Sequence, residues 1–424
     1  MKITKVLGYQ VLDSRGRPTV AAAITLENGA THTARVPSGA STGKHEAKEL
    51  RDGDSAISNR FYSGKSVNQA VNNINSVIAP ALENTALSLN DVDQTLLQLD
   101  STSNHSTLGA NATLAVSLAA AIAEAALAGK SLARYFSHSG PLEIPMPMVN
   151  ILSGGAHAGK TLDIQDVLVV PVGATSFAEA ISWAAAIREA AAALGAKQGK
   201  LTHLVADEGG IGIPFPSISA ACTFVEEAIA SVGLAAGKDV YLALDIAATQ
   251  FFSEGTYHLA TESKSFTSSN FVTHMNELVS RHPIISIEDP FAEDDWDAWQ
   301  RFTASAPQGL QILGDDLLTT NQNRLDRAVS ERSANAILIK PNQNGLVTET
   351  QKVLRSAQVK GFATVVSARS GETEDSWLAD LAVGWKSHQI KVGSTHGSER
   401  TAKWNRLLEL EATEKTIFSN PFKK

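Results

Sequence analysis

Apolar and polar residues follow two different rhythms along the chain, and the first rhythm covers its N-terminal part. Residues 2–12 and 19–26 have the composition of strands, and residues 27–29 (Glu-Asn-Gly) before the next apolar run indicate a hairpin turn. From residue 68 to 135, apolar residues recur at helical spacing. The pattern predicts an N-terminal α+β domain over residues 1–137.

In the second rhythm, short strand-like runs alternate with Ala-rich helical stretches over residues 138–424. The runs lie near residues 146–151, 166–171, 202–206, 239–245, 284–288, 310–314, 335–340, 362–367 and 388–392. Ser176 and Glu179 form a capping box that predicts a helix to about Lys197. This alternation favours a parallel barrel, a (β/α)8 fold of the TIM type, for the C-terminal domain. No Gly-x-Gly-x-x-Gly follows a strand, which weakens the alternative of an open doubly wound sheet.

Composition narrows the classes of partner. The formal net charge is -8 and no block of basic residues occurs, which argues against nucleic acid and anionic membranes. The most apolar stretch, residues 114–129, is short and is interrupted by Glu124, so we expect a buried helix and no membrane span. Cys222 is the only cysteine and cannot form an internal disulfide, which suits a cytoplasmic protein with a buried, inert thiol.

Charged residues end several of the strand-like runs. Asp245, Glu288 and Asp315 each follow an apolar run directly. In a parallel barrel, the carboxyl ends of the strands share one face, so these three carboxylates would converge there. Converging carboxylates repel one another unless a cation neutralises them, and all-oxygen ligands favour Mg²⁺, Ca²⁺ or Mn²⁺.

Cations end the later runs. Lys340 follows four apolar residues, and burial would lower its pKa toward the range of a general base, about 7–8. Arg369 is suited to binding a carboxylate or phosphate through two hydrogen bonds. This set predicts metal-assisted removal of a proton next to a carboxylate, with an acid opposite the base protonating a leaving group. The alternative is that each charge merely terminates its strand. That explanation is sufficient for a single residue, but it accounts poorly for six strands that all end in this way.

Longer motifs resemble the enolase family along almost the whole chain. They include Asp13-Ser-Arg-Gly-Arg-Pro-Thr19, Val36-Pro-Ser-Gly-Ala-Ser-Thr-Gly43, Ser153-Gly-Gly-Ala-His157, Asp207-Glu-Gly-Gly210, Ser286-Ile-Glu-Asp-Pro290, Gly314-Asp-Asp-Leu317, Arg369-Ser-Gly-Glu-Thr-Glu-Asp375 and Gln389-Ile-Lys391. The resemblance implies an N-terminal α+β domain followed by a modified barrel. It also implies a phosphopyruvate hydratase, a Mg²⁺-dependent lyase of glycolysis that interconverts 2-phosphoglycerate and phosphoenolpyruvate.

The same resemblance implies roles for individual residues. Lys340 resembles the base that takes the C2 proton, and Glu208 resembles the acid that helps hydroxide leave from C3. The implied Mg²⁺ ligands are Asp245, Glu288 and Asp315, together with Ser41 for a second ion. The implied substrate contacts are Gln165, His157, Arg369, Ser370 and Lys391, with Arg369 and Ser370 at the phosphate. The implied assembly is a homodimer or an assembly of dimers.

Three positions depart from the family pattern. Ala368 stands where the family usually has His, and Asp166 stands where it usually has Glu. The loop after His157 reads Gly159-Lys160-Thr161 instead of being acidic and Asn-rich. Loss of one hydrogen-bond donor beside the substrate can cost a factor of about 10²–10³ in rate. Arg17, Gln250 and Pro341 also differ from the usual Asn, Glu and Val.

These departures leave three readings of function. The first is an enolase, acting on a small phosphocarboxylate in the cytoplasm, with a lowered rate. The second is a paralogue that uses the space at Ala368 for a related phospho- or phosphonocarboxylate. The third is a binding or scaffold protein whose C-terminal Lys423-Lys424 contacts a host protein, with a cell-surface or secreted fraction suggested by resemblance alone.

Overall fold

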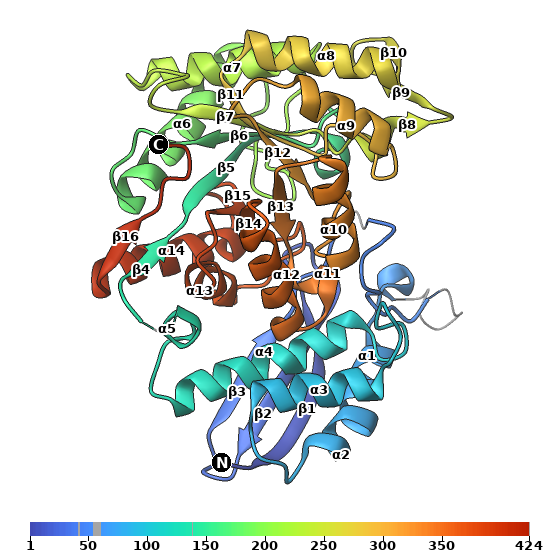
Figure 1. The fold of residues 1–424 in the computed structure, drawn as a ribbon. Coiled ribbons are helices and arrows are strands. Elements are labelled where there is room, and N and C mark those ends of the chain that lie inside the picture. The colour runs from blue at the N-terminus through green and yellow to red at the C-terminus, as the bar shows by residue number, and fades with distance from the viewer. Residues whose placement is uncertain (41–42, 54–60, 138, 424) are drawn as a thin grey trace.

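The N-terminal part of the protein is a three-stranded antiparallel sheet covered by helices. In the computed structural model, which describes residues 1–40, 43–53, 61–137 and 139–423, this part lies below the barrel (Figure 1). Its strands, in sheet order, are β1 (Ile3–Leu12), β2 (Pro18–Leu26) and β3 (Thr31–Arg35). Gly29, with φ of 84°, lies in the turn between β2 and β3, so the predicted hairpin is confirmed.

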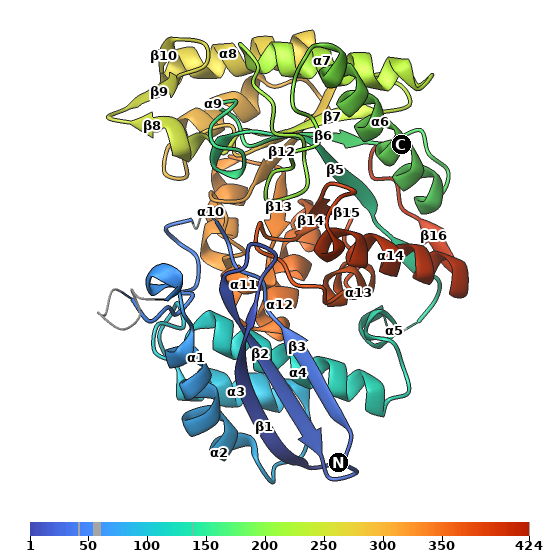
Figure 2. The same ribbon diagram turned by 180° about the vertical axis from the view of Figure 1, so that it is seen from behind.

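Helices pack on one face of this sheet, which Figure 2 shows from the other side. They are α1 (Asn68–Asn73), α2 (Ala79–Leu82), α3 (Leu89–Leu99), α4 (Ala110–Leu127) and α5 (Leu132–Ser137). Helix α4 lies against β2 and β3 and is buried along most of its length. It is the one helix of the described residues apolar enough to cross a membrane, and 78% of it is buried inside the protein. Its apolar composition therefore serves the core of this domain.

The C-terminal part is a closed eight-stranded barrel. Its strands are β5 (Met146–Ser153), β6 (Asp166–Val170), β7 (Tyr241–Asp245), β11 (Ile284–Glu288), β12 (Gln311–Gly314), β13 (Ala336–Ile339), β14 (Ala363–Ser367) and β15 (Gln389–Gly393). The predicted fold class, an α+β domain followed by a modified (β/α)8 barrel, is confirmed. The predicted boundary between residues 137 and 138 stays a prediction, because residue 138 lies outside the described residues.

Helices surround the barrel. They are α6 (Phe177–Lys197), α7 (Ile218–Ser231), α8 (Ser268–Arg281), α9 (Trp296–Ser305), α10 (Gln322–Glu331), α11 (Pro341–Asn344), α12 (Val347–Val359), α13 (Trp377–Gly384) and α14 (Ser398–Thr413). The hydroxyl of Ser176 accepts a hydrogen bond from Glu179 N at 3.1 Å, and α6 ends at Lys197, as the capping box predicted. Cys222 on α7 is fully buried, and burial raises the pKa of its thiol, in agreement with an inert cysteine.

The prediction of an all-parallel barrel is wrong at one strand. Strand β6 runs antiparallel to both β5 and β7, with Asp166 opposite Ser153 on one side and Asp245 on the other. The connection from β5 to β6, residues 154–165, contains a single 3₁₀ turn (Gly155–His157) and no α-helix, and the two antiparallel strands form a hairpin. The reversal places the first residue of β6 at the barrel end where the other strands finish.

The predicted strand at residues 202–206 is also absent. This segment forms turns, with an isolated bridge between Val205 and Ile211. Leu204 is 59% exposed and Val205 is 52% exposed, since no sheet edge is there to cover them. Glu208 therefore lies in a loop and not at a strand end, in contrast to the sequence interpretation. A small three-stranded antiparallel sheet that was not predicted follows β7; its strands are β8 (Phe252–Ser253), β9 (Thr256–Leu259) and β10 (Lys264–Thr267).

Candidate active site

Three buried carboxylates gather at the carboxyl ends of neighbouring strands. Asp245 ends β7 and Glu288 ends β11, and the two residues are direct partners in the parallel register. Asp315 follows β12, the next strand of the barrel. All three are buried. The structure thus brings together the three residues that the sequence proposed as metal ligands.

Lys391 of β15 lies between two of these carboxylates. Its Nζ is 2.7 Å from Asp245 Oδ2 and 2.7 Å from Glu288 Oε2. Burial lowers the pKa of Lys391, but Asp245 and Glu288 outweigh burial and hold it well above its usual value. Burial raises the pKa of Glu288 well above its usual range, and Asp245 raises it further, although Lys391 opposes both. One ammonium therefore neutralises part of the charge of the cluster.

Lys340, which follows β13, forms an ion pair with Asp315. Burial lowers the pKa of Lys340, but the charge of Asp315 outweighs burial, and the net shift is upward. The sequence interpretation, a pKa lowered toward 7–8, is wrong for this pairing. It considered burial and neighbouring cations but not a carboxylate in direct contact. Gln343, which was not predicted, donates to the other Asp315 oxygen at 2.8 Å.

His157 joins the candidate acid to a second buried carboxylate. Its Nε2 lies 3.8 Å from Glu208 Oε1, and its Nδ1 lies 3.5 Å from Asp166 Oδ2. Burial lowers the pKa of His157, but Glu208 first and then Asp166 raise it, to about 9. The imidazolium, with Arg400 and Lys391, in turn outweighs the effect of burial and lowers the pKa of Glu208. This arrangement favours the charged forms of both His157 and Glu208.

Residues of the N-terminal part complete the site at the barrel mouth. Glu46 accepts a hydrogen bond from Arg369 Nη1 at 2.9 Å, and Ala40 N donates to the hydroxyl of Ser370 at 2.7 Å. Glu46 was not found from the sequence, because it lies outside any strand end and beside no recognisable motif residue. Ser41, the proposed ligand of a second ion, lies outside the described residues.

Comparison with protein families decides the classification. Residues 3–136 match the family model described as "Enolase, N-terminal domain", and residues 141–419 match "Enolase, C-terminal TIM barrel domain". The chain belongs to the enolase family. The resemblance read from its motifs is thereby confirmed, and lyase chemistry is the activity that this membership supports.

The donor set at the mouth of this enolase barrel fits a metal cation. Asp245, Glu288 and Asp315 offer only carboxylate oxygens, which hard divalent cations prefer. The raised pKa of Glu288 shows that burial and the neighbouring carboxylates disfavour its charge, and a cation would relieve this repulsion. Asp289 and Asp316 lie near Asp315, with oxygens of the three within 4.8 Å of one another. Asp289, however, accepts the backbone N–H groups of Asp315 and Asp316 at 2.9 and 2.7 Å, which is a structural role.

A small cavity at this mouth connects the candidate residues of the enolase site. It is lined by Ala40, Glu46, His157, Gln165, Glu208, Asp315, Asp316, Lys340, Ser367, Ala368, Arg369, Ser370 and Lys391. Every proposed substrate contact lines it, and Gln165 donates from Nε2 to Asp245 Oδ2 at 3.1 Å. Ala368, one of the departures from the family, faces the same cavity beside Arg369. The cavity therefore combines cations for an anionic substrate with one proposed metal ligand, Asp315, while Asp245 and Glu288 contact it through Lys391.

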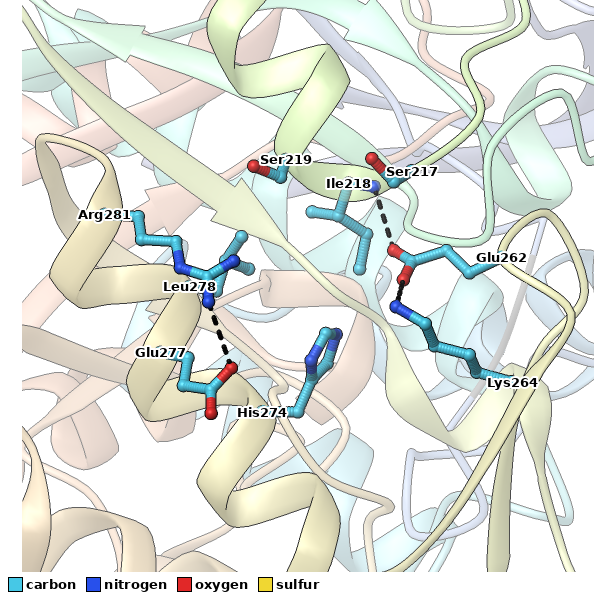
Figure 3. A pocket seen from close by; sticks show the side chains of 9 residues that line it. All are labelled: Ser217, Ile218, Ser219, Glu262, Lys264, His274, Glu277, Leu278 and Arg281. Atoms are coloured by element: carbon cyan, nitrogen blue, oxygen red, sulfur yellow. Dashed lines mark hydrogen bonds and ion pairs between the residues drawn. The ribbon is translucent and has the colours of Figure 1, made fainter.

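A second pocket lies away from the barrel mouth, between α7, α8 and the turn before β10 (Figure 3). Its lysine, Lys264, is bonded to Glu262 at 2.9 Å, and its arginine, Arg281, lies 3.4 Å from Glu277 (Figure 3). The oxygen of Glu262 also accepts the backbone N–H of Ile218 at 3.2 Å, so an acid already occupies the N-terminus of α7. The mouth cavity is thus the better candidate for an anionic substrate.

Proposed function

We propose that this protein catalyses the reversible dehydration of 2-phosphoglycerate to phosphoenolpyruvate, the phosphopyruvate hydratase reaction of glycolysis, with Mg²⁺ as the metal. The observation that supports it is the joining of two opposite sets of charge at one barrel mouth, where Asp315 lines the cavity and Asp245 and Glu288 bind Lys391 of its wall. Buried carboxylates at three strand ends suit a metal, and Lys340, Lys391 and Arg369 suit a doubly anionic substrate. Family membership supports the lyase class, and the residues supply the details of the proposal.

Each residue has a proposed part. Lys340 would lose its own proton once a cation bound at Asp315 replaces their ion pair, because that carboxylate holds its pKa up, and the neutral amine then takes the C2 proton. Glu208, on the opposite side near His157, protonates the leaving hydroxyl. Asp245, Glu288 and Asp315 hold Mg²⁺, with Ser41 serving a second ion. Bound Mg²⁺ would neutralise the charge that develops on the substrate carboxylate.

The proposed binding residues are paired with other residues of the protein, and the substrate takes over these pairings when it binds. Arg369, now paired with Glu46, binds the phosphate together with Ser370. Gln165, His157 and Lys391 contact the remainder of the molecule. The incoming anion also raises the pKa of Glu208, since a like charge disfavours the carboxylate, and so prepares it to act as an acid. The protein works as a cytoplasmic homodimer or an assembly of dimers.

The test is an assay of the purified protein with 2-phosphoglycerate, with and without Mg²⁺. We expect phosphoenolpyruvate to form only when Mg²⁺ is present and formation to stop after chelation. Absence of phosphoenolpyruvate under both conditions, in folded protein that binds Mg²⁺, would overturn the proposed substrate.

Ala368 favours a second candidate substrate. Its methyl group lies between Ser367 and Arg369 in the cavity wall, where the family usually has a histidine. A larger phospho- or phosphonocarboxylate would fill the space that a histidine takes in relatives. The assay separates the two candidates: Mg²⁺-dependent exchange of the C2 proton of 2-phosphoglycerate without dehydration would favour the larger substrate.

A further inference from the structure

Two glutamines connect the glycine-rich loop of residues 154–160 to the carboxylate of Asp245. Ala156 N, in this loop, donates to Gln250 Oε1 at 3.3 Å. Gln250 Nε2 donates to Gln165 Oε1 at 2.8 Å, and Gln165 Nε2 donates to Asp245 Oδ2 at 3.1 Å. A continuous chain of hydrogen bonds thus runs from the loop that carries His157 to a proposed metal ligand.

The two ends of this chain determine the direction of every bond within it. A backbone N–H group can only donate, and an ionised carboxylate can only accept. The amide of Gln165 must therefore direct its NH₂ group toward Asp245 and its oxygen toward Gln250. Gln250 must then donate to Gln165 and accept from Ala156. In this chain Gln250 therefore acts as both donor and acceptor, which the glutamate usual at this position in the family does not do when ionised.

The backbone brings the same segments into close contact. Gln165 N donates to the carbonyl of Asp245 at 2.9 Å, and Gly154 N donates to the carbonyl of Gln165 at 2.8 Å. A Cβ on Gly155 would lie 3.3 Å from Gln250 Oε1 and 3.3 Å from Gln165 Cα, and its φ of 47° also favours glycine. The glycine therefore allows the loop to lie directly against both glutamines.

We propose that Gln250 is a positioning residue that couples the placement of loop 154–160, and of His157 on it, to the orientation of Gln165 and Asp245. Its consequence for catalysis depends on the proposed function, but its effect on the loop does not. Gln250 touches neither Glu208 nor Lys340, and it acts through Gln165 and through the backbone of Ala156.

Two substitutions of Gln250 separate its hydrogen bond to the loop from its hydrogen bond to Gln165. Gln250→Met removes both hydrogen bonds and adds no charge. Gln250→Glu keeps an acceptor for Ala156 N but cannot donate to Gln165, so two oxygens would face each other at the present 2.8 Å contact. The Gln165 amide would then turn over and direct its oxygen at Asp245, which repels it. Gln322→Met is the matched control, because Gln322 on α10 bonds Asp326 and Ser356 and makes none of these contacts.

Lys160 provides a reporter of the loop, since it is exposed and trypsin cleaves after lysine. In protein without metal or substrate, we expect cleavage after Lys160 to be at least about fivefold faster in Gln250→Met, which loses the hydrogen bond from Ala156 N. Gln250→Glu, which keeps an acceptor for Ala156 N, and Gln322→Met should be cleaved near the rate of the parent protein. Unchanged cleavage in Gln250→Met, at an unchanged melting temperature, would overturn the proposal.

The Mg²⁺ affinity, measured by titration calorimetry, and the kinetics test the Asp245 end of this series of hydrogen bonds. We expect Gln250→Glu and Gln250→Met to weaken Mg²⁺ binding by about threefold to tenfold, with Gln322→Met unchanged. In the assay with 2-phosphoglycerate at saturating Mg²⁺, kcat should fall more than KM rises. A parent protein that does not turn over 2-phosphoglycerate would refute the proposed function alone, since cleavage and Mg²⁺ binding are read without substrate. An unchanged Mg²⁺ affinity in both variants would overturn the link to Asp245.

Discussion

Asp166→Glu is the substitution whose effect can be worked out most fully from the structure. Asp166 is fully buried, and its Oδ1 accepts hydrogen bonds from Asn150 and from Ser153, the latter at 2.8 Å. Its Oδ2 lies 3.5 Å from His157 Nδ1, and among the described residues neither atom has a hydrogen-bond partner. The distance exceeds the range of about 2.7–2.9 Å for a charged pair. The shorter side chain thus stops just short of His157.

One added methylene lengthens the side chain by roughly one bond length, about 1.5 Å. About half of this length, directed at His157, closes the 3.5 Å separation to hydrogen-bond distance, and such a bond to a charged group contributes about 1.5–3 kcal/mol. Overpacking a full core position costs about 1–3 kcal/mol, so we expect the free energy of unfolding to change little. The new hydrogen bond should instead change the pKa of His157 and raise the rate of the proposed reaction.

The sign of the pKa change follows from the charge. Glu208 and Asp166 already raise the pKa of His157 to about 9, and a closer carboxylate favours the imidazolium further. The stability that His157 contributes is present below its unfolded pKa of about 6.5 and is lost as the pH rises through about 9. In Asp166→Glu this loss moves to higher pH.

The measurements are a titration of the His157 ring by nuclear magnetic resonance and kcat/KM for 2-phosphoglycerate. Together with Ala368→His, which supplies the missing donor beside Arg369, we expect kcat/KM to rise at least tenfold, about 1.4 kcal/mol. Asp163→Glu is the control, since Asp163 bonds the backbone at Ala260 and Thr261 and not His157. A ring pKa that is unchanged or lowered would refute the reasoning about distance. A folded double variant with a reduced rate would show that the cavity is adapted to its present residues and to another substrate.

Three further predictions test other parts of the molecule. Lys340→Ala should lose both dehydration and exchange of the C2 proton, whereas Glu208→Gln should lose dehydration but keep part of the exchange. Exchange at the parent rate in Lys340→Ala would exclude Lys340 as the base. Burial raises the pKa of Asp93 to about 6, so ionisation of this carboxyl lowers the free energy of unfolding progressively between about pH 4 and pH 6. Asp93→Asn should therefore raise the free energy of unfolding at pH 8 by up to about 3 kcal/mol and change it little at pH 4. The thiol of Cys222 should react with Ellman's reagent only after denaturation, and rapid reaction of the native protein would contradict its burial.

The strand-end rule placed the three proposed metal ligands on one face of the barrel because it depends on topology alone. Asp245, Glu288 and Asp315 follow apolar runs, and any barrel with those strands parallel brings them to one face. The same rule failed for Glu208. The apolar run at residues 202–206 has the composition of a strand, but no neighbouring strand edge is there for it to pair with. Burial on a sheet, which decides such cases, is a tertiary property.

The sequence also showed which charges would gather at the mouth, but it could not show how they pair. Pairing depends on distances of a few tenths of an ångström, and it reversed the expected pKa shift of Lys340 through a single contact with Asp315. Glu46 holds Arg369 by the same kind of contact, from a segment with no recognisable signal.

Pairing also explains how so many charges can be buried at one site. Lys391 neutralises part of the charge of Asp245 and Glu288, Lys340 pairs with Asp315, and Glu46 pairs with Arg369, so that each of these three cations has a carboxylate partner. An anionic substrate and a metal cation arriving together would take over the cations and the carboxylates of these pairs. Either one alone would leave a displaced protein charge buried and unpaired, which is costly. The internal ion pairs therefore favour joint binding of metal and substrate over the binding of either one.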